Sequence, residues 1–509
     1  MKNKKSNQFY VGGENWIDNG NDTLEIGKKE IEKIKLYLKK YLLLDNVNFL
    51  FGTGSSIHLG AETIQGIPKQ IEDAVEASET LDLFKKLKSK YEQKMIDEIK
   101  VKISTEESYY IWENNRNKLT KDLNAKLENL EVKSQKIDLK KALNLVDQSE
   151  MNELYKMAID IKLEDFLNYL YALKYLIINS SGLISGDLDI TETNLEELIS
   201  VIKKALFKMC DLDKISIEDN IFLNNKFNNN IKEVMINEGK YTYHRSFLTS
   251  ILQRPLNLRR ANIFTLNYDL AFEYACDELG VQYINGFVGF NERNFRPEVY
   301  NHDFFYPGDI TEGKVKRIER VIKYYKLHGS LNWIHKKENK NNPYGLFEVP
   351  IDLIRINLDK DNLQNEIGDI MIYPTSSKKE FTLNFPYSEL FRKFADRLHQ
   401  PEAVLFVVGY SFYDEHINDI IYQALANPSF TLIIIDFNGT NSGGEILRLN
   451  KLKDPRIIIS QGKYLGDFKI FAKELLPNME QEDTRSKVTK TLEQLFSSSL
   501  IEKEEEEDV

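Results

Sequence analysis

The chain has 509 residues, of which 42% are hydrophobic and 29% charged, and its net charge is −11 at neutral pH. This composition is typical of a globular protein, and the length predicts two domains or one large domain with an insertion. No apolar run approaches the ~20 residues that a membrane-spanning helix needs, so we expect no membrane partner. The acidic balance argues against an extended nucleic-acid-binding face.

The N-terminus and the cysteines limit the location and the chemistry. The opening MKNKKSNQFYVGGENW has basic residues but no apolar stretch after them, so it is not typical of a secretory signal, and we expect a cytoplasmic protein. The chain has two cysteines, Cys210 and Cys276, which are too few for a disulfide framework or a four-cysteine zinc site.

Residues 1–46 predict a helical segment, in which Ile31, Ile34, Leu38, Tyr41 and Leu42 recur at helical spacing. Asp22 or Thr23 is the expected N-cap. The apolar run VNFLF that follows, residues 47–51, predicts a buried parallel strand that ends at Gly52. This strand opens the first part of an α/β domain, which we assign to residues 47–74.

Residues 75–243 predict a large helical insertion, because they are rich in Lys and Glu and contain few Gly or Pro. The clearest helix has one apolar face, formed by Leu163, Phe166, Leu167, Leu170, Leu173 and Ile177. Another helix runs through Leu195, Leu198, Ile202 and Leu206, and we expect it to begin after Thr193 or Asn194. The amphipathic faces of this block either pack within the monomer or form an interface.

Residues 244–477 predict the second part of the α/β domain. Short apolar runs there alternate with helical patterns, at residues 262–266, 323–327, 403–408, 431–435 and 456–460. Such alternation indicates a Rossmann-like, doubly wound parallel sheet. The fold class is therefore α/β with a large helical insertion. Residues 478–509 end in EKEEEEDV and predict a solvated, disordered acidic tail.

The first candidate site is the Gly-rich turn Gly52, Thr53, Gly54 and Ser55, which follows the strand at residues 47–51 and is expected to open a helix. Glycines let a backbone approach a pyrophosphate, and a helix N-terminus supplies free N–H donors. The turn lacks the third glycine of the dinucleotide fingerprint and the lysine of a P-loop. A purely structural turn remains an equal alternative.

Polar residues follow two further strands. Asn267 and Asp269, in TLNYD, emerge where ligands of open α/β sheets bind, although either side chain could simply cap the next helix. His328, in KLHGSLNW, is the best placed of the seven histidines, and its ordinary pKa of about 6.5 suits a general base. A structural histidine at a strand end is the alternative.

Two more strand ends complete the set. In VVGYSFYDEHI, Gly409 leaves a strand, and Ser411 either offers donors to phosphate or ribose or caps the next helix, with Asp414 completing an approximate capping box. The nearby His416 is expected to be structural. Asp436 ends the strand at residues 431–435 and is placed to accept hydrogen bonds from ribose hydroxyls.

Taken in this order, the motifs GTGSS, TLNYD, LHGSLNW, GYS and IDFN resemble the sirtuin superfamily over residues 45–75 and 255–475. LHGSLNW and GYSxxDxHI resemble the sirtuin-like effectors of bacterial antiphage defence more closely than they resemble the protein deacylases. Two departures separate the chain from the protein deacylases: Leu266 stands where those enzymes carry glutamine, and Cys210 and Cys276 cannot form their four-cysteine zinc ribbon.

The resemblance implies an NAD+ glycohydrolase that releases nicotinamide and linear or cyclic ADP-ribose. Asn267 would hold the attacking water or ribose hydroxyls, His328 would be the general base and Asp269 would orient nicotinamide. Gly52, Gly54 and Ser55 would line the pyrophosphate, and Ser411 and Asp436 would serve the adenosine half. Thr53 and Gly409 are also expected to bind the dinucleotide. NAD+ is thus the expected substrate, with no metal. Protein deacylation and a non-catalytic nucleotide-binding assembly module are the alternatives.

The implied NAD+ consumption has a consequence for partners, because an ungated enzyme of this kind would harm its own cell. We therefore expect a homo-oligomer or a gating partner, of which a HerA-type hexameric ATPase is the first to test. The helical insertion is the candidate interface, and packing of its amphipathic faces within the monomer is the equal alternative.

Overall fold

The structure is a computed structural model and describes residues 7–17, 27–62, 67–104, 161–179, 190–224, 228–306, 316–340, 342–359, 369–372 and 387–477. The expected acidic tail lies outside these residues. Within them, no helix combines the length and apolar character needed to cross a membrane. The first helix, α1 (Lys28–Leu42), has Gly27 at its N-cap, so the prediction that Asp22 or Thr23 caps this helix is wrong. Asp22 and Thr23 themselves lie outside the described residues.

The centre of the protein is a nine-stranded sheet with the order β2-β1-β16-β15-β14-β3-β4-β10-β5. The six strands predicted from apolar runs are all present and parallel to one another, and they confirm the α/β fold class. These strands are β3 (Val47–Phe51), β4 (Asn262–Thr265), β10 (Val321–Lys326), β14 (Val404–Val408), β15 (Thr431–Asp436) and β16 (Ile457–Gln461).

The register aligns the carboxyl ends of the central strands. Thr265 pairs with both Lys326 and Phe51, Phe51 pairs with Val408, and Val408 pairs with Ile435. The five strand ends therefore form one row across the sheet. The helix connections change sides between β3 and β14, and this kind of switch point is where open α/β sheets bind ligands.

Short strands that the sequence pattern did not predict extend the sheet at both edges. β1 (Gln8–Val11) is antiparallel to β16 and carries β2 (Glu14–Asn15) outside it. β5 (Gln282–Ile284) is parallel to β10 at the other edge. The N-terminal segment thus contributes strands as well as helix α1.

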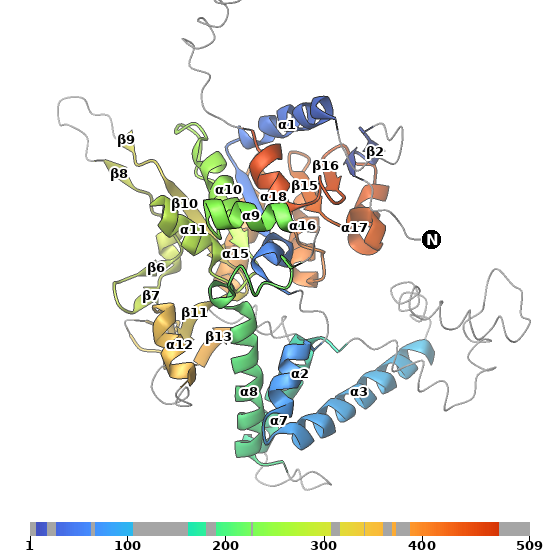
Figure 1. The fold of residues 1–509 in the computed structure, drawn as a ribbon, viewed down its shortest axis with the longest axis vertical. Helices are drawn as coiled ribbons and strands as arrows, with labels where there is room; N and C mark the ends of the chain where they lie inside the picture. Colours follow the sequence, from blue (N-terminus) through green and yellow to red (C-terminus); the bar gives the residue numbers. More distant parts are fainter. Residues whose placement is uncertain are drawn as a thin grey trace, which may run out of the picture.

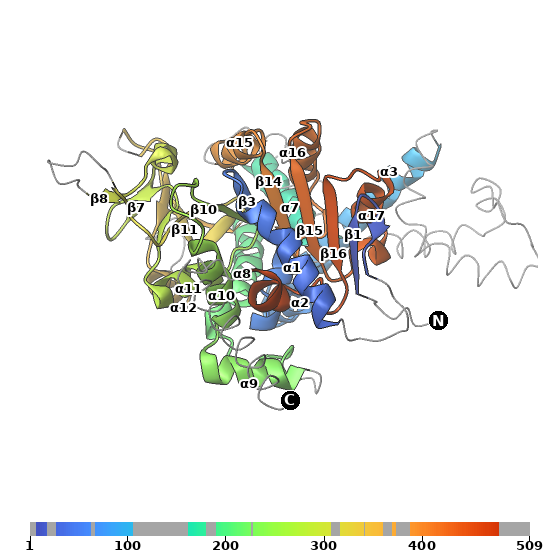
Figure 2. The same cartoon turned by 90° about the horizontal axis from the view of Figure 1, so that it is seen from above.

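Each face of the sheet has its own core, because side chains alternate along a strand. Phe49 and Phe51 of β3 face one cluster with α1, α10 (Thr242–Leu252), α11 (Ala271–Leu279) and α18 (Phe468–Ile470). Leu50 faces the other cluster with α15 (Tyr387–Leu398), α16 (Glu415–Leu425) and α17 (Gly444–Lys451). Figure 2 shows α15 and α16 on the side of the sheet opposite α1 and α10. The sheet is thus covered on both faces.

A second, five-stranded sheet lies beside β10 and has the order β13-β11-β12-β7-β6. Its centre is Trp333, which is buried and lies 5.0 Å from Phe287, centroid to centroid. Its strands are β6 (Phe287–Val288), β7 (Arg293–Phe295), β11 (Gly329–His335), β12 (Leu346–Glu348) and β13 (Asp369–Ile372). Two further elements of this part of the chain are the two-stranded sheet of β8 (Phe305–Tyr306) and β9 (Lys316–Arg317) and the helix α12 (Ile351–Asp359).

A helical lobe projects from the α/β body (Figure 1). It consists of α2 (Lys69–Glu76), α3 (Leu81–Ser104), α7 (Leu163–Asn179) and α8 (Glu192–Cys210). Its core includes the predicted apolar face of α7 and also contacts Tyr268 and Leu331 of the body. α8 begins at Glu192, earlier than predicted, because Thr191 and Asn194 form a reciprocal capping box. Along the chain, α9 (Asn229–Glu238) lies between α8 of the lobe and α10.

Candidate active site

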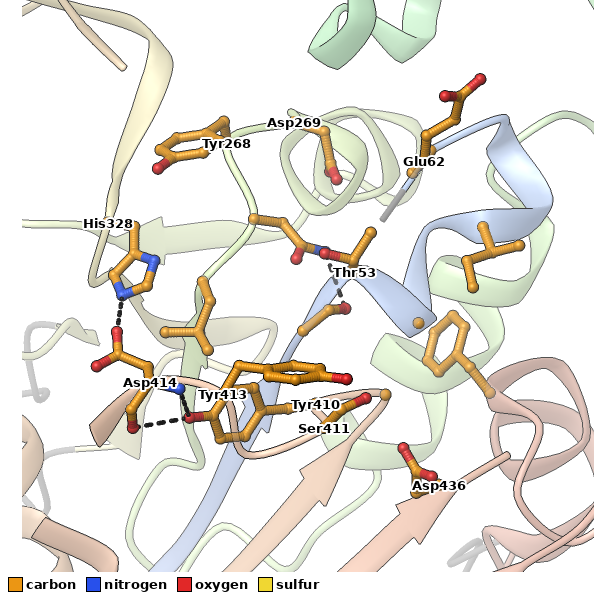
Figure 3. Close-up of a pocket in the computed structure, with 18 of the residues that line it drawn as sticks. Thr53, Glu62, Tyr268, Asp269, His328, Tyr410, Ser411, Tyr413, Asp414 and Asp436 are labelled. Carbon is orange, nitrogen blue, oxygen red and sulfur yellow. Dashed lines mark hydrogen bonds and ion pairs between the residues drawn. The ribbon is translucent and has the colours of Figure 1, made fainter. Parts of the chain in front are cut away.

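A cavity of about 850 Å³ opens along the row of strand ends (Figure 3). Its volume lies within the ~300–1,000 Å³ that small-molecule and cofactor sites occupy. Nine of the ten residues singled out from the sequence line it: Gly52, Thr53, Gly54, Asn267, Asp269, His328, Gly409, Ser411 and Asp436. The tenth, Ser55, is fully buried beneath the Gly-rich loop, where its Oγ donates to Gly52 O at 2.8 Å.

The Gly-rich loop does not open an α-helix, which corrects the expectation. It forms two short 3-10 turns, Thr53–Ser55 and Ile57–Leu59, and the second ends at Gly60 with a left-handed φ of 100°. The amides of Gly52, Gly54 and Ser55 all donate to carbonyl oxygens of the protein. The amide of Thr53 has no acceptor among the described residues, so it is the N–H that this turn offers to a ligand.

The glycines of this loop are required by its contact with the loop after β14. A Cβ on Gly52 would lie 2.6 Å from Gly409 O, and a Cβ on Gly54 would lie 2.6 Å from Gly409 Cα. Gly54 N also donates to Gly409 O at 2.9 Å. Close backbone packing therefore explains these glycines whether or not a pyrophosphate binds here.

Asn267 fastens the Gly-rich loop to the end of β4. Its Nδ2 donates to Gly52 O at 3.1 Å and to the hydroxyl oxygens of Ser55 and Ser56 at 3.2 Å each. Gly52 O can only accept, so the amide nitrogen must face this cluster and Oδ1 must face away from it. Oδ1 has no donor among the described residues and is available to a hydroxyl or water in the cavity.

Asp269 lies on a buried network of charges. Its Oδ1 accepts from Ala271 N, the first residue of α11, at 3.0 Å, but the N-cap position of this helix is Leu270 and not Asp269. Lys326 Nζ lies beneath, donating to Asp269 O at 2.6 Å and to Glu273 Oε1 at 3.0 Å. Burial raises the pKa of Asp269, and the nearby Lys326 ammonium opposes that rise. The residue thus serves the helix and also lines the cavity.

His328 follows β10 and contacts a carboxylate from the far side of the cavity. Its Nε2 lies 3.0 Å from Asp414 Oδ2, and both side chains are largely buried, with exposed fractions of 12% and 6%. In Figure 3 the second ring nitrogen of His328 points away from Asp414. The residue expected to be a general base therefore has a carboxylate partner on one nitrogen.

The loop after β14 is held in an uncommon conformation. Gly409 has a φ of 64° and the buried Phe412 a φ of 59°, a left-handed value that is rare for an aromatic residue. Asn418 Nδ2 donates to Phe412 O at 2.8 Å, and Tyr410 OH accepts from Asp414 N at 3.0 Å. These contacts fix the loop and the position of Asp414.

The N-cap of α16 also differs from the expectation. Asp414, not Ser411, caps this helix, because its Oδ1 accepts from His416 N at 3.0 Å. Ser411 is exposed on the cavity rim. The predicted Ser411–Asp414 capping box is therefore wrong, and Ser411 is left with no role in the helix. His416, expected to be structural, lines the cavity at the start of α16.

The end of β15 forms the opposite side of the cavity. The buried Asp436 accepts with Oδ1 from the amides of Asn438 at 2.9 Å and Gly439 at 2.5 Å. Asp436 thus shapes the 3-10 turn Gly439–Ser442 and lines the cavity as well. Phe437, the next residue, is 39% exposed and also lines the cavity.

The helical lobe closes another part of the wall. The start of α7 contributes Lys162, Leu163 and Asp165, and the end of α8 contributes Met209 and Cys210. Burial raises the pKa of Cys210 to about 12, with a further contribution from Asp269, so this thiol is not a nucleophile near neutral pH. Cys210 and Cys276 are both free.

Sequence reasoning missed the contacts between motifs. Asp414 was considered only for a helix cap, and Lys326 and Glu273 were not singled out. One sequence feature could have pointed to Asp414 as a site residue. It is the Asp of the GYSxxDxHI motif and lies two residues before His416. Among the described residues, no group of three or more His, Cys, Asp or Glu side chains is placed to hold a metal ion.

Comparison with known proteins bears on part of this site. The SIR2-like domain family matches residues 261–440, a segment that contains Asn267, Asp269, His328, Ser411 and Asp436 but not the Gly-rich loop. No curated protein matches the chain. SIR2-like domains are NAD-dependent enzymes. The match supports a relationship of the matched segment to the sirtuin-like superfamily, and it suggests an NAD-related activity in general.

Proposed function

We propose that the protein is an NAD+ glycohydrolase. The observation that carries the proposal is that Asn267 and His328, from β4 and β10, line one cavity of about 850 Å³, with a buried carboxylate on one nitrogen of His328. The SIR2-like match supports NAD+ as the substrate. An amide oxygen and an imidazole are the groups needed to place and deprotonate a water molecule.

The reaction breaks the bond between C1′ of the nicotinamide ribose and the pyridine nitrogen. That nitrogen takes the electron pair and loses its positive charge, while a water oxygen forms the new bond at C1′. His328 accepts the proton that the water releases, and Asn267 Oδ1 accepts a hydrogen bond from the water or a ribose hydroxyl. General-base catalysis of this kind contributes typically ~10²–10⁴ in rate.

The rest of the cavity accommodates the other parts of the dinucleotide. Asp269 orients the nicotinamide end beside Asn267, and the Thr53 amide donates to the pyrophosphate between the two glycine loops. Ser411 and Asp436 bind the adenosine half at the opposite end. This division is supported by the positions of these residues along one row of strand ends.

Leu266 argues against the deacylase alternative, because it lines the cavity where deacylases carry glutamine. An aliphatic side chain there cannot hydrogen-bond a polar acyl or ribose group. NAD-dependent turnover of an acyl-lysine peptide would restore that alternative. Tight binding of ADP-ribose with no turnover under any activating condition would instead favour a non-catalytic nucleotide-binding module.

We further propose a cytoplasmic antiphage effector that depletes cellular NAD+ only when it is activated. Residues 75–243 are the proposed interface for self-assembly or for a HerA-type ATPase, flanked by the α/β segments 47–74 and 244–477. The lobe's contribution of Lys162, Leu163 and Met209 to the cavity wall supports this arrangement, because movement of the lobe would alter the site.

Nicotinamide release by the purified protein tests the function. NAD+ is incubated with the protein alone and with the ATPase, and nicotinamide and ADP-ribose are separated and quantified. Equal molar release of the two products supports hydrolysis. Consumption of NAD+ only in the presence of an acyl peptide would contradict it.

A further inference from the structure

We propose that Asp414 is a positioning residue that selects the tautomer of His328. The contact is between Asp414 Oδ2 and His328 Nε2, at 3.0 Å. The two atoms lie at ion-pair distance without the alignment of a hydrogen bond. A carboxylate oxygen can only accept and repels a nitrogen lone pair, so the contact favours a proton on the imidazole nitrogen that faces it. His328 then has its lone pair on Nδ1, the nitrogen that Figure 3 shows pointing away from Asp414.

The carboxylate is held rigidly enough to impose this choice. Its Oδ1 is fixed by His416 N at 3.0 Å, and its main-chain amide donates to Tyr410 OH at 3.0 Å. Tyr410 OH in turn donates to Asn418 Oδ1 at 3.0 Å or to Asp414 O at 3.1 Å. Asp414 cannot move away from His328 without breaking the helix cap and this network.

The left-handed backbone at Phe412 is also consistent with a positioning role. A φ of 59° at an aromatic residue costs of order 1–3 kcal/mol and persists only where its surroundings hold it. Here the Asn418 side chain holds the Phe412 carbonyl, two residues before Asp414. The loop therefore adopts the conformation that delivers the carboxylate to His328.

A role in capping α16 alone is the competing explanation, and one substitution separates the two. Asp414→Asn keeps the size of the side chain, and its Oδ1 still accepts from His416 N, because Asn is as good an N-cap as Asp. Its NH₂ group, however, donates to His328 Nε2 and forces the proton onto Nδ1. The variant thus keeps the cap and reverses the tautomer.

The catalytic meaning of this contact rests on the proposed function, but the tautomer can be measured without turnover. Histidine labelled with ¹⁵N reports which ring nitrogen is protonated, and His328→Gln identifies the His328 signal by its loss. We expect protonated Nε2 in the wild-type protein and protonated Nδ1 in Asp414→Asn. Asp419→Asn, an exposed carboxylate on the same helix, makes the same charge change and should leave His328 unaffected.

Activity gives the second readout. Asp414→Asn should lower kcat for nicotinamide release by ~10²–10⁴, the usual value of a general base, with little change in KM. Asp414→Ser, which can cap the helix but cannot reach His328, provides a second variant if Asp414→Asn does not fold. Protonated Nδ1 in the wild-type protein, or an unchanged tautomer in both variants, would overturn the inference. A reversed tautomer in a protein that never releases nicotinamide would support it and contradict the proposed function instead.

Discussion

Asn267 Nδ2 lies 3.1 Å from the carbonyl oxygen of Gly52, a residue 215 positions earlier in the chain. This contact, together with those to Ser55 and Ser56, makes the Gly-rich loop and the end of β4 one unit. The amide has two functions at once: its nitrogen holds the loop, and its oxygen faces the cavity. Substitutions of Asn267 therefore test loop structure and substrate placement together.

Replacing Asn267 with Asp should destabilise the protein. The carboxylate would face the carbonyl oxygen of Gly52, which can only accept, and the three hydrogen bonds that Nδ2 donates in this buried site would be lost, which costs ~1–3 kcal/mol. The free energy of unfolding, measured in urea, checks this. The same substitution at the exposed Asn441 is the control and should change the free energy by much less. An equal effect at the two positions would contradict the assigned contacts.

Replacing Gly54 with Ala should separate the two glycine loops. The new Cβ would meet Gly409 Cα at 2.6 Å, and because both partners are backbone, one loop must shift. We expect a loss of ~1–3 kcal/mol of stability and weaker binding of ADP-ribose by calorimetry. Gly280→Ala meets no atom within 4 Å and carries only the cost of a left-handed φ of 63°. Undiminished ADP-ribose affinity in Gly54→Ala would show that the cavity does not depend on this packing.

The buried His244 should make the protein sensitive to acid. Burial lowers the pKa of His244 from 6.5 to about 3, and neither ring nitrogen has a partner among the described residues. The unfolded chain therefore binds a proton that the folded protein does not. The contribution of neutral His244 to the free energy of unfolding is fully present above pH ~6.5. It falls by up to ~1.4 kcal/mol per pH unit as the pH drops towards ~3.

His244→Phe removes this titration among apolar neighbours, since the His244 ring lies 4.8 Å from Phe272 and 4.9 Å from Phe468, centroid to centroid. Thermal unfolding near neutral pH and at about pH 5 should show a smaller acid shift than in the wild type. The exposed His302→Gln should keep the wild-type shift. Identical shifts in all three proteins would contradict the burial of His244.

Arg355 of α12 should be important for the join between the lobe and the body. Its Nε and Nη2 contact the two carboxylate oxygens of Asp211 at 2.8 and 2.6 Å, directly after α8 ends. Arg355→Lys loses this two-point contact and should cost ~1.5–3 kcal/mol. The exposed pair Arg448–Glu445 is the control, where Arg448→Lys should cost ~0–1 kcal/mol. Equal urea midpoints for the two variants would refute the difference.

The central sheet was predictable because parallel strands buried on both faces are continuous apolar runs, such as VNFLF and TLIII. The second sheet was not, because β6 has two residues and β7 three, one of them Arg293. Such short strands carry no periodicity. They depend on partners that are distant in sequence, as in the pairing of Phe347 with Asn294.

The same distinction applies to the site. Parallel strands with helical connections bring their carboxyl ends to one edge, so the convergence of Asn267, His328 and Asp436 followed from the motif order. The contact of His328 with Asp414 could not be predicted from the motif order, because β3 and β4 lie between β10 and β14 in the sheet. No local pattern specifies how two loops meet across that distance. The 3-10 turns after Gly52 were missed for a related reason, since packing against Gly409 sets their path.

The most direct test of the proposed function is the rate of nicotinamide release by His328→Ala. Release should fall by ~10²–10⁴, while ADP-ribose affinity and the unfolding midpoint stay close to wild type. The exposed His399→Ala should release nicotinamide at the wild-type rate. A folded His328→Ala protein that releases nicotinamide as fast as the wild type would contradict the role of His328 and the mechanism built on it.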